Sequence, residues 1–247
     1  MQQWKKNIVL KEQLFTVHIA EQKAEQMNYK QKLEIINRCQ RNWDKEFVIP
    51  QEHLDELIDV AANTPTKQYE SYYNLYVIIN KELIAELLDY TYGYVMPMNG
   101  KYAVWRNPQM GASAYFIWTG KIPTTVRNFK HDGSTMHEER NENIFCSVGV
   151  SSGILAYHAA GLGYSIGFNR NHWNKDDDSY FNKKLGIPIE ERIILGQGIG
   201  MPKYNKHNKS DEDCVLIDDE VVQVDNPLTY PSFSSMLKRN TKVKIYE

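Results

Sequence analysis

The chain has 247 residues, of which 42% are hydrophobic and 24% are charged, and its formal net charge is −2. This composition is ordinary for a globular protein, and the charge excludes the strongly basic surface that a nucleic-acid-binding protein needs. The three cysteines show no Cys-x-x-Cys spacing, which argues against a disulfide framework or a zinc site and favours a reducing compartment.

Residues 1–30 are predicted to form a polar extension in front of a single α+β domain that spans residues 31–247. The first residues are not followed by the apolar stretch of a signal sequence. No window approaches the roughly 18 apolar residues that a membrane span needs. We therefore expect a cytoplasmic protein without a membrane partner.

The spacing of the apolar residues predicts the main helices and strands. A helix begins at Pro50, because the apolar residues from Leu54 to Ala62 recur at i, i+3, i+4, i+7 and i+8. Short apolar runs predict buried strands over residues 75–79, 112–119 and 192–200, and further helices are expected over residues 81–94 and 143–160. Residues 97–100 and 120–141 are expected to be loops, and residues 215–224 a small hairpin.

The helix predicted over residues 143–160 carries small residues at near-helical spacing, among them Gly149 and Gly153. Small residues let a second helix approach closely, so this helix suits either the core or an interface between subunits. Cys146 lies in the same apolar stretch and is expected to be a small core residue.

The most informative stretch is residues 157–168 (YHAAGLGYSIGF), where an apolar helix gives way to a β-like segment. Gly161 and Gly163 can adopt the positive φ values that end a helix, and they let a backbone or a flat ligand come close. The chain also has sixteen tyrosines and five tryptophans, which serve either in core packing or in stacking on a planar ligand.

Two more segments bear on a ligand. Residues 38–43 (RCQRNW) contain two arginines, whose guanidinium groups offer paired donors to phosphate and carbonyl oxygens. Taken alone, this segment would more simply be a solvated helix end. Residues 64–77 (TPTKQYESYYNLYV) form a loop that leads into the first strand.

In this order, the three segments resemble the nitroreductase family over roughly residues 33–210. Residues 38–43 are similar to the family's Arg-Ser-x-Arg-x-aromatic motif, with Cys39 in place of serine. The loop is similar to the family's Pro-Ser-x-x-Asn-x-Gln-Pro-Trp motif, with tyrosine, serine and tyrosine in place of asparagine, glutamine and proline. Residues 107–109 (NPQ), 185–188 (LGIP) and 198–202 (GIGMP) also fit the family pattern.

The resemblance implies a three-layer α+β fold with a central, mostly antiparallel sheet flanked by helices. It further implies a homodimer with FMN at the subunit interface, and a tail over residues 214–247 that could wrap the partner. In the family, a main-chain N–H of the Ile-Gly pair points at flavin N5, and the loop before the first strand contacts the partner's flavin. The FMN contacts implied for this chain are Arg38, Cys39, Arg41, Pro65, Thr66, Lys67, Tyr69, Ser71, Ile166, Gly167, Lys206 and Lys209. Lys238 and Arg239 are an alternative to the last pair for the phosphate.

The implied activity is the transfer of hydride from NAD(P)H, through flavin N5, to a small acceptor such as a nitroaromatic or a quinone. Donor and acceptor would use one open face in turn, which predicts ping-pong kinetics, and neither a catalytic side chain nor a metal is required. Two alternatives stay open. The chain could be a relative that uses reduced flavin for dehalogenation or that cleaves the flavin, or it could be a non-enzymatic flavin-binding protein.

Overall fold

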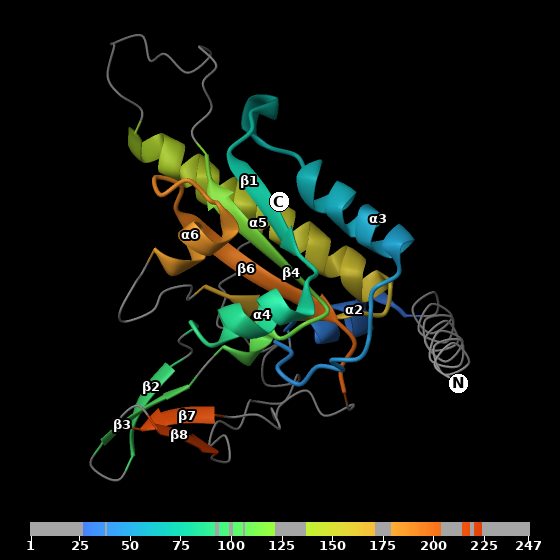
Figure 1. Cartoon of the computed structure of the whole chain (residues 1–247). Coiled ribbons are helices and arrows are strands. Elements are labelled where there is room, and N and C mark those ends of the chain that lie inside the picture. Colours follow the sequence, from blue (N-terminus) through green and yellow to red (C-terminus); the bar gives the residue numbers. More distant parts are fainter. Residues whose placement is uncertain are drawn as a thin grey trace, which may run out of the picture.

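The computed structural model describes residues 27–37, 39–91, 94–98, 101–105, 107–121, 137–170, 179–203, 214–217 and 220–223 (Figure 1). Its helices are α2 (Tyr29–Asn37), α3 (Gln51–Ala62), α4 (Lys81–Leu88), α5 (His137–Gly161) and α6 (Tyr180–Leu185), with 3₁₀ turns η1 (Lys67–Tyr69) and η2 (Pro108–Met110). Its strands are β1 (Tyr73–Ile78), β2 (Tyr94–Met98), β3 (Lys101–Trp105), β4 (Ala114–Gly120), β5 (Ser165–Asn169), β6 (Ile193–Gly200), β7 (Cys214–Ile217) and β8 (Glu220–Gln223).

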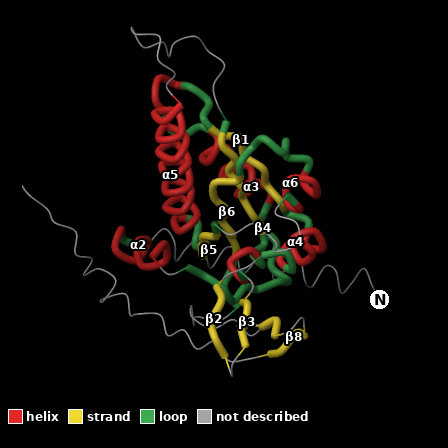
Figure 2. The backbone as a smooth tube through the Cα atoms, turned by 90° about the vertical axis from the view of Figure 1, so that its left-hand side faces the viewer, coloured by secondary structure: helices red, strands yellow, loops and turns green. Residues whose placement is uncertain are grey.

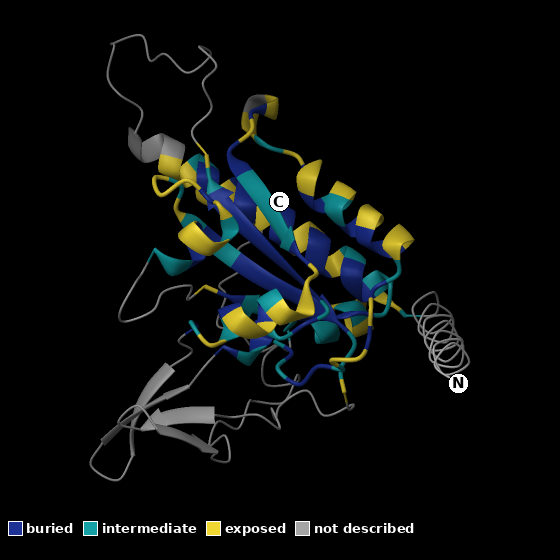
Figure 3. Cartoon of the chain, in the orientation of Figure 1, coloured by how far each residue is buried: buried dark blue, intermediate teal, exposed yellow. Residues whose placement is uncertain are grey.

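The main sheet has the strand order β1-β4-β6-β5, and every neighbouring pair is antiparallel. The two central strands, β4 and β6, are the buried apolar runs, because both of their faces are covered by helices. Figure 3 shows these strands buried between partly exposed helices. β1 and β5 therefore form the two opposite edges of the sheet.

Helices cover both faces of this sheet and produce three layers. On one face, α3 and α5 pack Leu57, Leu155 and Ala156 against Phe116 and Trp118. On the other face, the apolar side chains of α4, α6 and η2 cover the opposite side of β1 and β4. Figure 2 shows α5 on one side of the strands and α4 and α6 on the other. This confirms the predicted three-layer α+β architecture with an antiparallel central sheet.

A buried polar relay ties the first two layers together. The indole Nε1–H of Trp118 on β4 donates to Ser151 Oγ on α5 at 2.9 Å, and Ser151 Oγ donates to Ala61 O on α3 at 2.7 Å. Each buried polar atom in the relay thus has a partner, so the relay orients both helices on the sheet without an unpaired group.

Helix α5 has two apolar faces of different exposure. Residues 141–161 within it are long and apolar enough to cross a membrane, which corrects the expectation that no window approaches a span. Half of that window is buried inside the fold, as in the core helix of a globular domain. The other half includes Cys146, which is exposed and not the core residue that we expected.

Two helix boundaries differ from the predictions. The helix expected over residues 81–94 ends at Leu88, because buried Thr91 donates its hydroxyl to Leu88 O at 2.8 Å and accepts the Asn107 N–H at 2.9 Å. The Thr91 side chain therefore links the end of α4 to Asn107, which precedes η2. The helix expected to begin near residue 143 already begins at His137.

A second antiparallel sheet has the order β2-β3-β7-β8. The hairpin predicted over residues 215–224 is confirmed as β7 and β8, and β7 pairs with β3 through Val104↔Leu216. The expected loop at residues 97–100 is corrected, because residues 94–98 and 101–105 pair as β2 and β3. Residues 214–223 of the predicted tail thus include strands that pair within this chain, while the rest of the tail lies outside the described residues.

Candidate functional site

The segment that follows α2 lies along the outer edge of β5. The Gln40 N–H donates to Ile166 O at 2.7 Å, and the Asp44 N–H donates to Met201 O at 2.9 Å, just after β6. The main chain is turned here by the buried Gln40 side chain, whose Oε1 accepts the N–H groups of Arg41 at 2.9 Å and Asn42 at 3.0 Å. Gln40, which lies between the two arginines of residues 38–43, therefore sets the conformation of this segment.

The thiol of Cys39 completes this edge. Phe168 N–H donates to Cys39 Sγ at 3.1 Å, and the thiol lies 3.4 Å from Phe168 O, so the side chain pairs with β5 as another strand would. Burial raises the pKa of the Cys39 thiol, against the opposing effects of the Arg41 charge, the Phe168 N–H and the Gln109 side chain. Cys39 is thus a neutral thiol that positions the segment.

Arg41 lies half-buried beside this thiol. Its Nη1–H donates to Cys39 O at 2.9 Å, which holds the guanidinium close to the segment's own main chain. The site therefore contains a positioned cation next to a strand edge, an arrangement suited to a ligand with a negative or strongly polar rim.

Ile166 offers a main-chain donor on the same edge. In an antiparallel strand, the N–H and C=O of one residue point to the same side, and Ile166 O points to Gln40. The Ile166 N–H therefore also points outward from the sheet. A main-chain amide is a donor that does not change its protonation state near neutral pH.

Gly167 is required by packing within the chain. A Cβ at this position would lie 2.7 Å from Gln40 O and 3.0 Å from both Gln109 Cβ and Trp43 Cζ2. Gly198, opposite Gly167 on β6, would place a Cβ 2.2 Å from Gln109 O. The group that packs closely against these two glycines is thus the protein's own η2 turn.

Gln109 on η2 is the residue that the sequence analysis missed as part of the site. Its side chain hydrogen-bonds the Cys39 thiol, whereas its Oε1 is buried and has no hydrogen-bond partner among the described residues. A buried acceptor without a protein partner is a position to which a bound water or a ligand can donate. The NPQ triplet before β4 was the available signal, but spacing alone did not link it to Cys39.

The predicted loop residues lie at the other edge of the sheet. Pro65 and Thr66 precede η1, and Ser71 precedes β1, the edge strand opposite β5. Tyr69 is 98% exposed and adopts a positive φ of 59°, an uncommon conformation for a bulky residue. Lys67 is also exposed. Figure 1 shows the turn between α3 and β1 at one end of the domain and α2 at the other.

The structure therefore brings some of the predicted site residues together and separates others. Cys39, Arg41, Ile166 and Gly167 meet at the β5 edge, which we call the β5-edge cluster together with Gln109. The predicted contacts between residues 65 and 71 lie across the sheet from it. Arg38, Lys206 and Lys209 lie outside the described residues, as do the alternative phosphate residues Lys238 and Arg239.

Comparison with solved structures identifies the architecture. An FMN-dependent nitroreductase of Clostridium difficile superposes with a TM-score of 0.51 at 13% identity, over 70% of this chain and 89% of that one. A nitroreductase family protein of Streptococcus pneumoniae gives a TM-score of 0.52 at 14% identity, over 70% and 91% of the two chains. The chain has the nitroreductase fold.

A third solved structure comes from Exiguobacterium sibiricum, is named as a nitroreductase and contains FMN. It superposes on the present chain with a TM-score of 0.51 at 16% identity, over 72% of the present chain and 90% of its own. No family model matches the sequence, and no curated protein matches it. The nitroreductase likeness is therefore one of fold, carried by structure at low sequence identity.

Proposed function

We propose that this chain is an FMN-dependent oxidoreductase that takes hydride from NAD(P)H and reduces a small acceptor such as a nitroaromatic or a quinone. The observation that carries the proposal is the β5-edge cluster, which gathers a cation, an outward main-chain N–H and an unpartnered buried acceptor within a nitroreductase fold. Two of the three structures compared above are named for FMN or contain it.

The residues of the cluster fit the polar rim of a flavin. That rim alternates carbonyl oxygens and ring nitrogens, which accept hydrogen bonds, with one N–H, which donates. Arg41 and the Ile166 N–H are donors of the kind that the accepting atoms need, and Gln109 Oε1 is the acceptor that the N–H needs. The cluster therefore matches a flavin in the types of its polar groups.

When bound, FMN would supply the two-electron chemistry, because it accepts a hydride and passes it on. The chain's own residues would bind and orient it. Arg41 would favour negative charge on the ligand, while the Ile166 N–H is a fixed donor. Cys39 and Gln109 would keep the segment against β5.

The predicted loop can join this site only from a second copy of the chain. Residues 65–71 and the β5-edge cluster lie at opposite edges of a four-stranded sheet, so one chain cannot place both against the same ligand. Two chains related by a twofold axis can place both against one ligand, because the loop of each chain would lie beside the β5-edge cluster of the other. We therefore infer a homodimer with two sites at its interface.

Helix α5 supplies the surface for that contact. Its exposed apolar stripe, which we call the α5 stripe, consists of Phe145, Gly149, Val150, Gly153, Ile154 and Tyr157. A Cβ at Gly149 or Gly153 would meet nothing within 4 Å in this chain, so these glycines are not required by packing within the subunit. An apolar stripe with glycines one turn apart suits close packing against the same helix of a partner.

A cytoplasmic location is part of this proposal. Cys39 and Cys146 are free thiols, which agrees with a reducing compartment, where NAD(P)H is also available.

The visible spectrum of the purified protein tests the proposed function. We expect flavin absorbance after incubation with FMN and gel filtration, and bleaching of that absorbance by NADPH or NADH without oxygen. Steady-state rates with a nitroaromatic or a quinone should give the parallel double-reciprocal lines of ping-pong kinetics. A protein that stays colourless after incubation with FMN would contradict the proposal, whereas one that binds FMN but is not bleached would be a flavin-binding protein without this activity.

A further inference from the structure

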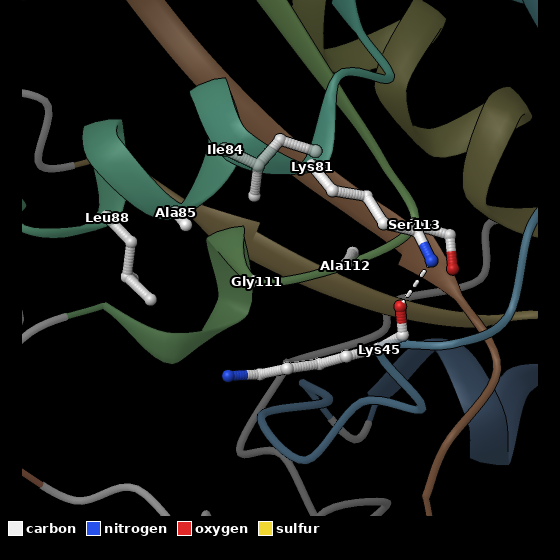
Figure 4. Close-up of a pocket in the computed structure, with 8 residues that line it drawn as sticks. All are labelled: Lys45, Lys81, Ile84, Ala85, Leu88, Gly111, Ala112 and Ser113. Atoms are coloured by element: carbon white, nitrogen blue, oxygen red, sulfur yellow. Dashed lines mark hydrogen bonds between the residues drawn. The ribbon is translucent and has the colours of Figure 1, made fainter.

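A cavity lies between α4 and the chain that leads into β4 (Figure 4). Helix α4 contributes Ile84, Ala85 and Leu88 to its wall, residues 111–113 form its floor, and Lys45 closes it from the side. The close-up shows the apolar side chains of α4 facing the main chain of residues 111–112. The cavity is small and partly open to solvent, so its occupant would be a small molecule.

Two lysines give the cavity its charge. Lys81 donates from Nζ to Lys45 O at 2.6 Å, which fixes the Lys81 ammonium at one end of the cavity, whereas Figure 4 shows the Lys45 ammonium reaching along the side toward the Leu88 end. Lys81 is also the first residue of α4, so the helix adds partial positive charge there. No carboxylate occurs among the residues that line the cavity.

The polar part of the wall also includes Ser113. Its Oγ is buried and has no hydrogen-bond partner among the described residues. Figure 4 shows Ser113 at the same end of the cavity as the Lys81 ammonium. The Lys81 ammonium is a donor suited to a carboxylate, and the enclosed Ser113 hydroxyl lies beside it as a second polar group.

The cavity is distinct from the β5-edge cluster. None of its lining residues belongs to that cluster, and the η2 turn separates the two, since η2 packs Gln109 against Gly167 and Gly198. A ligand there would therefore not compete for the residues that are proposed to hold the flavin.

We propose that this cavity binds a small carboxylate with an apolar body. The carboxylate would lie near Lys81 and Ser113, and the apolar body would lie along Ile84, Ala85 and Leu88, with Lys45 adding a second positive charge at the side. Burial of the apolar part favours binding of the hydrocarbon, and the anchored ammonium selects the anion over a neutral molecule of the same shape.

Benzoate and benzyl alcohol form the pair of probes, because they share the ring and differ in charge. We would measure both affinities by NMR titration of the full chain. We expect benzoate to bind at least about tenfold more tightly than benzyl alcohol, and the difference to shrink as the salt concentration rises. Equal affinities, or no binding of either probe, would overturn the proposal.

Variants locate the binding. Lys81→Met should weaken benzoate binding about tenfold and leave benzyl alcohol binding unchanged, which also shows that the cavity has kept its shape. Lys81→Arg should retain benzoate binding, and Lys30→Met on α2 serves as the control for the loss of an exposed lysine. Unchanged benzoate binding in both Lys81→Met and Lys45→Met would overturn the assignment. None of these titrations requires bound flavin, so their outcome is independent of the proposed function.

Discussion

At the scale of single residues, Gly167 is the position where packing and ligand binding are easiest to confuse. A Cβ there would lie 2.7 Å from Gln40 O, so Gly167→Ala should lower the free energy of unfolding of the flavin-free protein by about 1–3 kcal/mol. Urea unfolding checks this. Gly111→Ala is the control, because its Cβ would make only an ordinary 3.5 Å contact with Pro108 O. Unchanged stability with lost flavin binding would instead place a ligand beside Gly167.

Arg41 is the described cation of the candidate site, and its substitution tests the cluster directly. Arg41→Ala should weaken FMN binding by about 1.5–3 kcal/mol, the effect of losing a charge-assisted hydrogen bond. Fluorescence titration with FMN measures it, and Lys121→Ala is the control for the loss of an exposed cation away from the cluster. An FMN affinity equal to that of the wild type would show that Arg41 does not contact the ligand.

Glu86 makes a pH-dependent contact between α4 and α6. Its carboxylate lies 2.6 Å from both Lys184 Nζ and Tyr180 Oη, and these hydrogen bonds lower the pKa of Glu86 below its ordinary value. A lowered pKa in the folded state means that the stabilisation is complete above pH 4.5 and is lost as the pH falls below it. The urea midpoints of the wild type and Glu86→Gln should therefore differ at pH 7, and the difference should shrink as the pH falls below 4.5. A difference that stays constant as the pH falls would assign the effect to packing.

At the scale of elements, α5 offers a substitution whose effects on the subunit and on the dimer are opposite. Gly153→Ala should stabilise an isolated subunit by about 0.5–1 kcal/mol, because alanine favours the helix and the new methyl meets nothing within the chain. The same methyl should weaken a dimer in which two α5 helices pack closely. Urea unfolding and sedimentation equilibrium measure the two effects separately.

A charge in the α5 stripe makes the same test stronger. Ile154→Arg should produce a monomer, whereas Ile189→Arg, which also replaces an exposed isoleucine but lies before β6, should leave the assembly unchanged. If both variants sediment like the wild type, α5 is not the subunit contact.

The elements also show how far the sequence alone could lead. β4 and β6 were predictable because they are buried apolar runs whose neighbours in the chain define their ends. The strand expected over residues 75–79 exists as β1, but as an edge strand that is mostly half-buried, and Ile79 after it is exposed. The β2–β3 pair was missed, because Pro97, Asn99 and Gly100 indicate a loop. Its pairing with β7 also joins segments that are far apart in the sequence. Gln109 was missed for the same reason, since its contact with Cys39 depends on the folding of η2 over β5.

At the scale of the whole molecule, the separation of the two predicted halves of the site links flavin binding to assembly. If each site needs the loop of a second subunit, FMN affinity should fall as the protein is diluted below its dimer dissociation constant. Fluorescence titrations at several protein concentrations measure this. In Gly153→Ala, the loss of FMN affinity should begin at a higher protein concentration than in the wild type. An FMN affinity that does not change with protein concentration would mean that one chain is sufficient.

The pairing of β3 with β7 has a consequence for truncated forms of the protein. A two-stranded hairpin has little stability by itself, and β2 and β3 gain their neighbour only from a segment that is synthesised long afterwards. Ending the chain at residue 203 would keep all four strands of the main sheet but leave that early hairpin with a bare edge. Such a shortened chain should fold its three layers and yet be cut by proteases between residues 94 and 105.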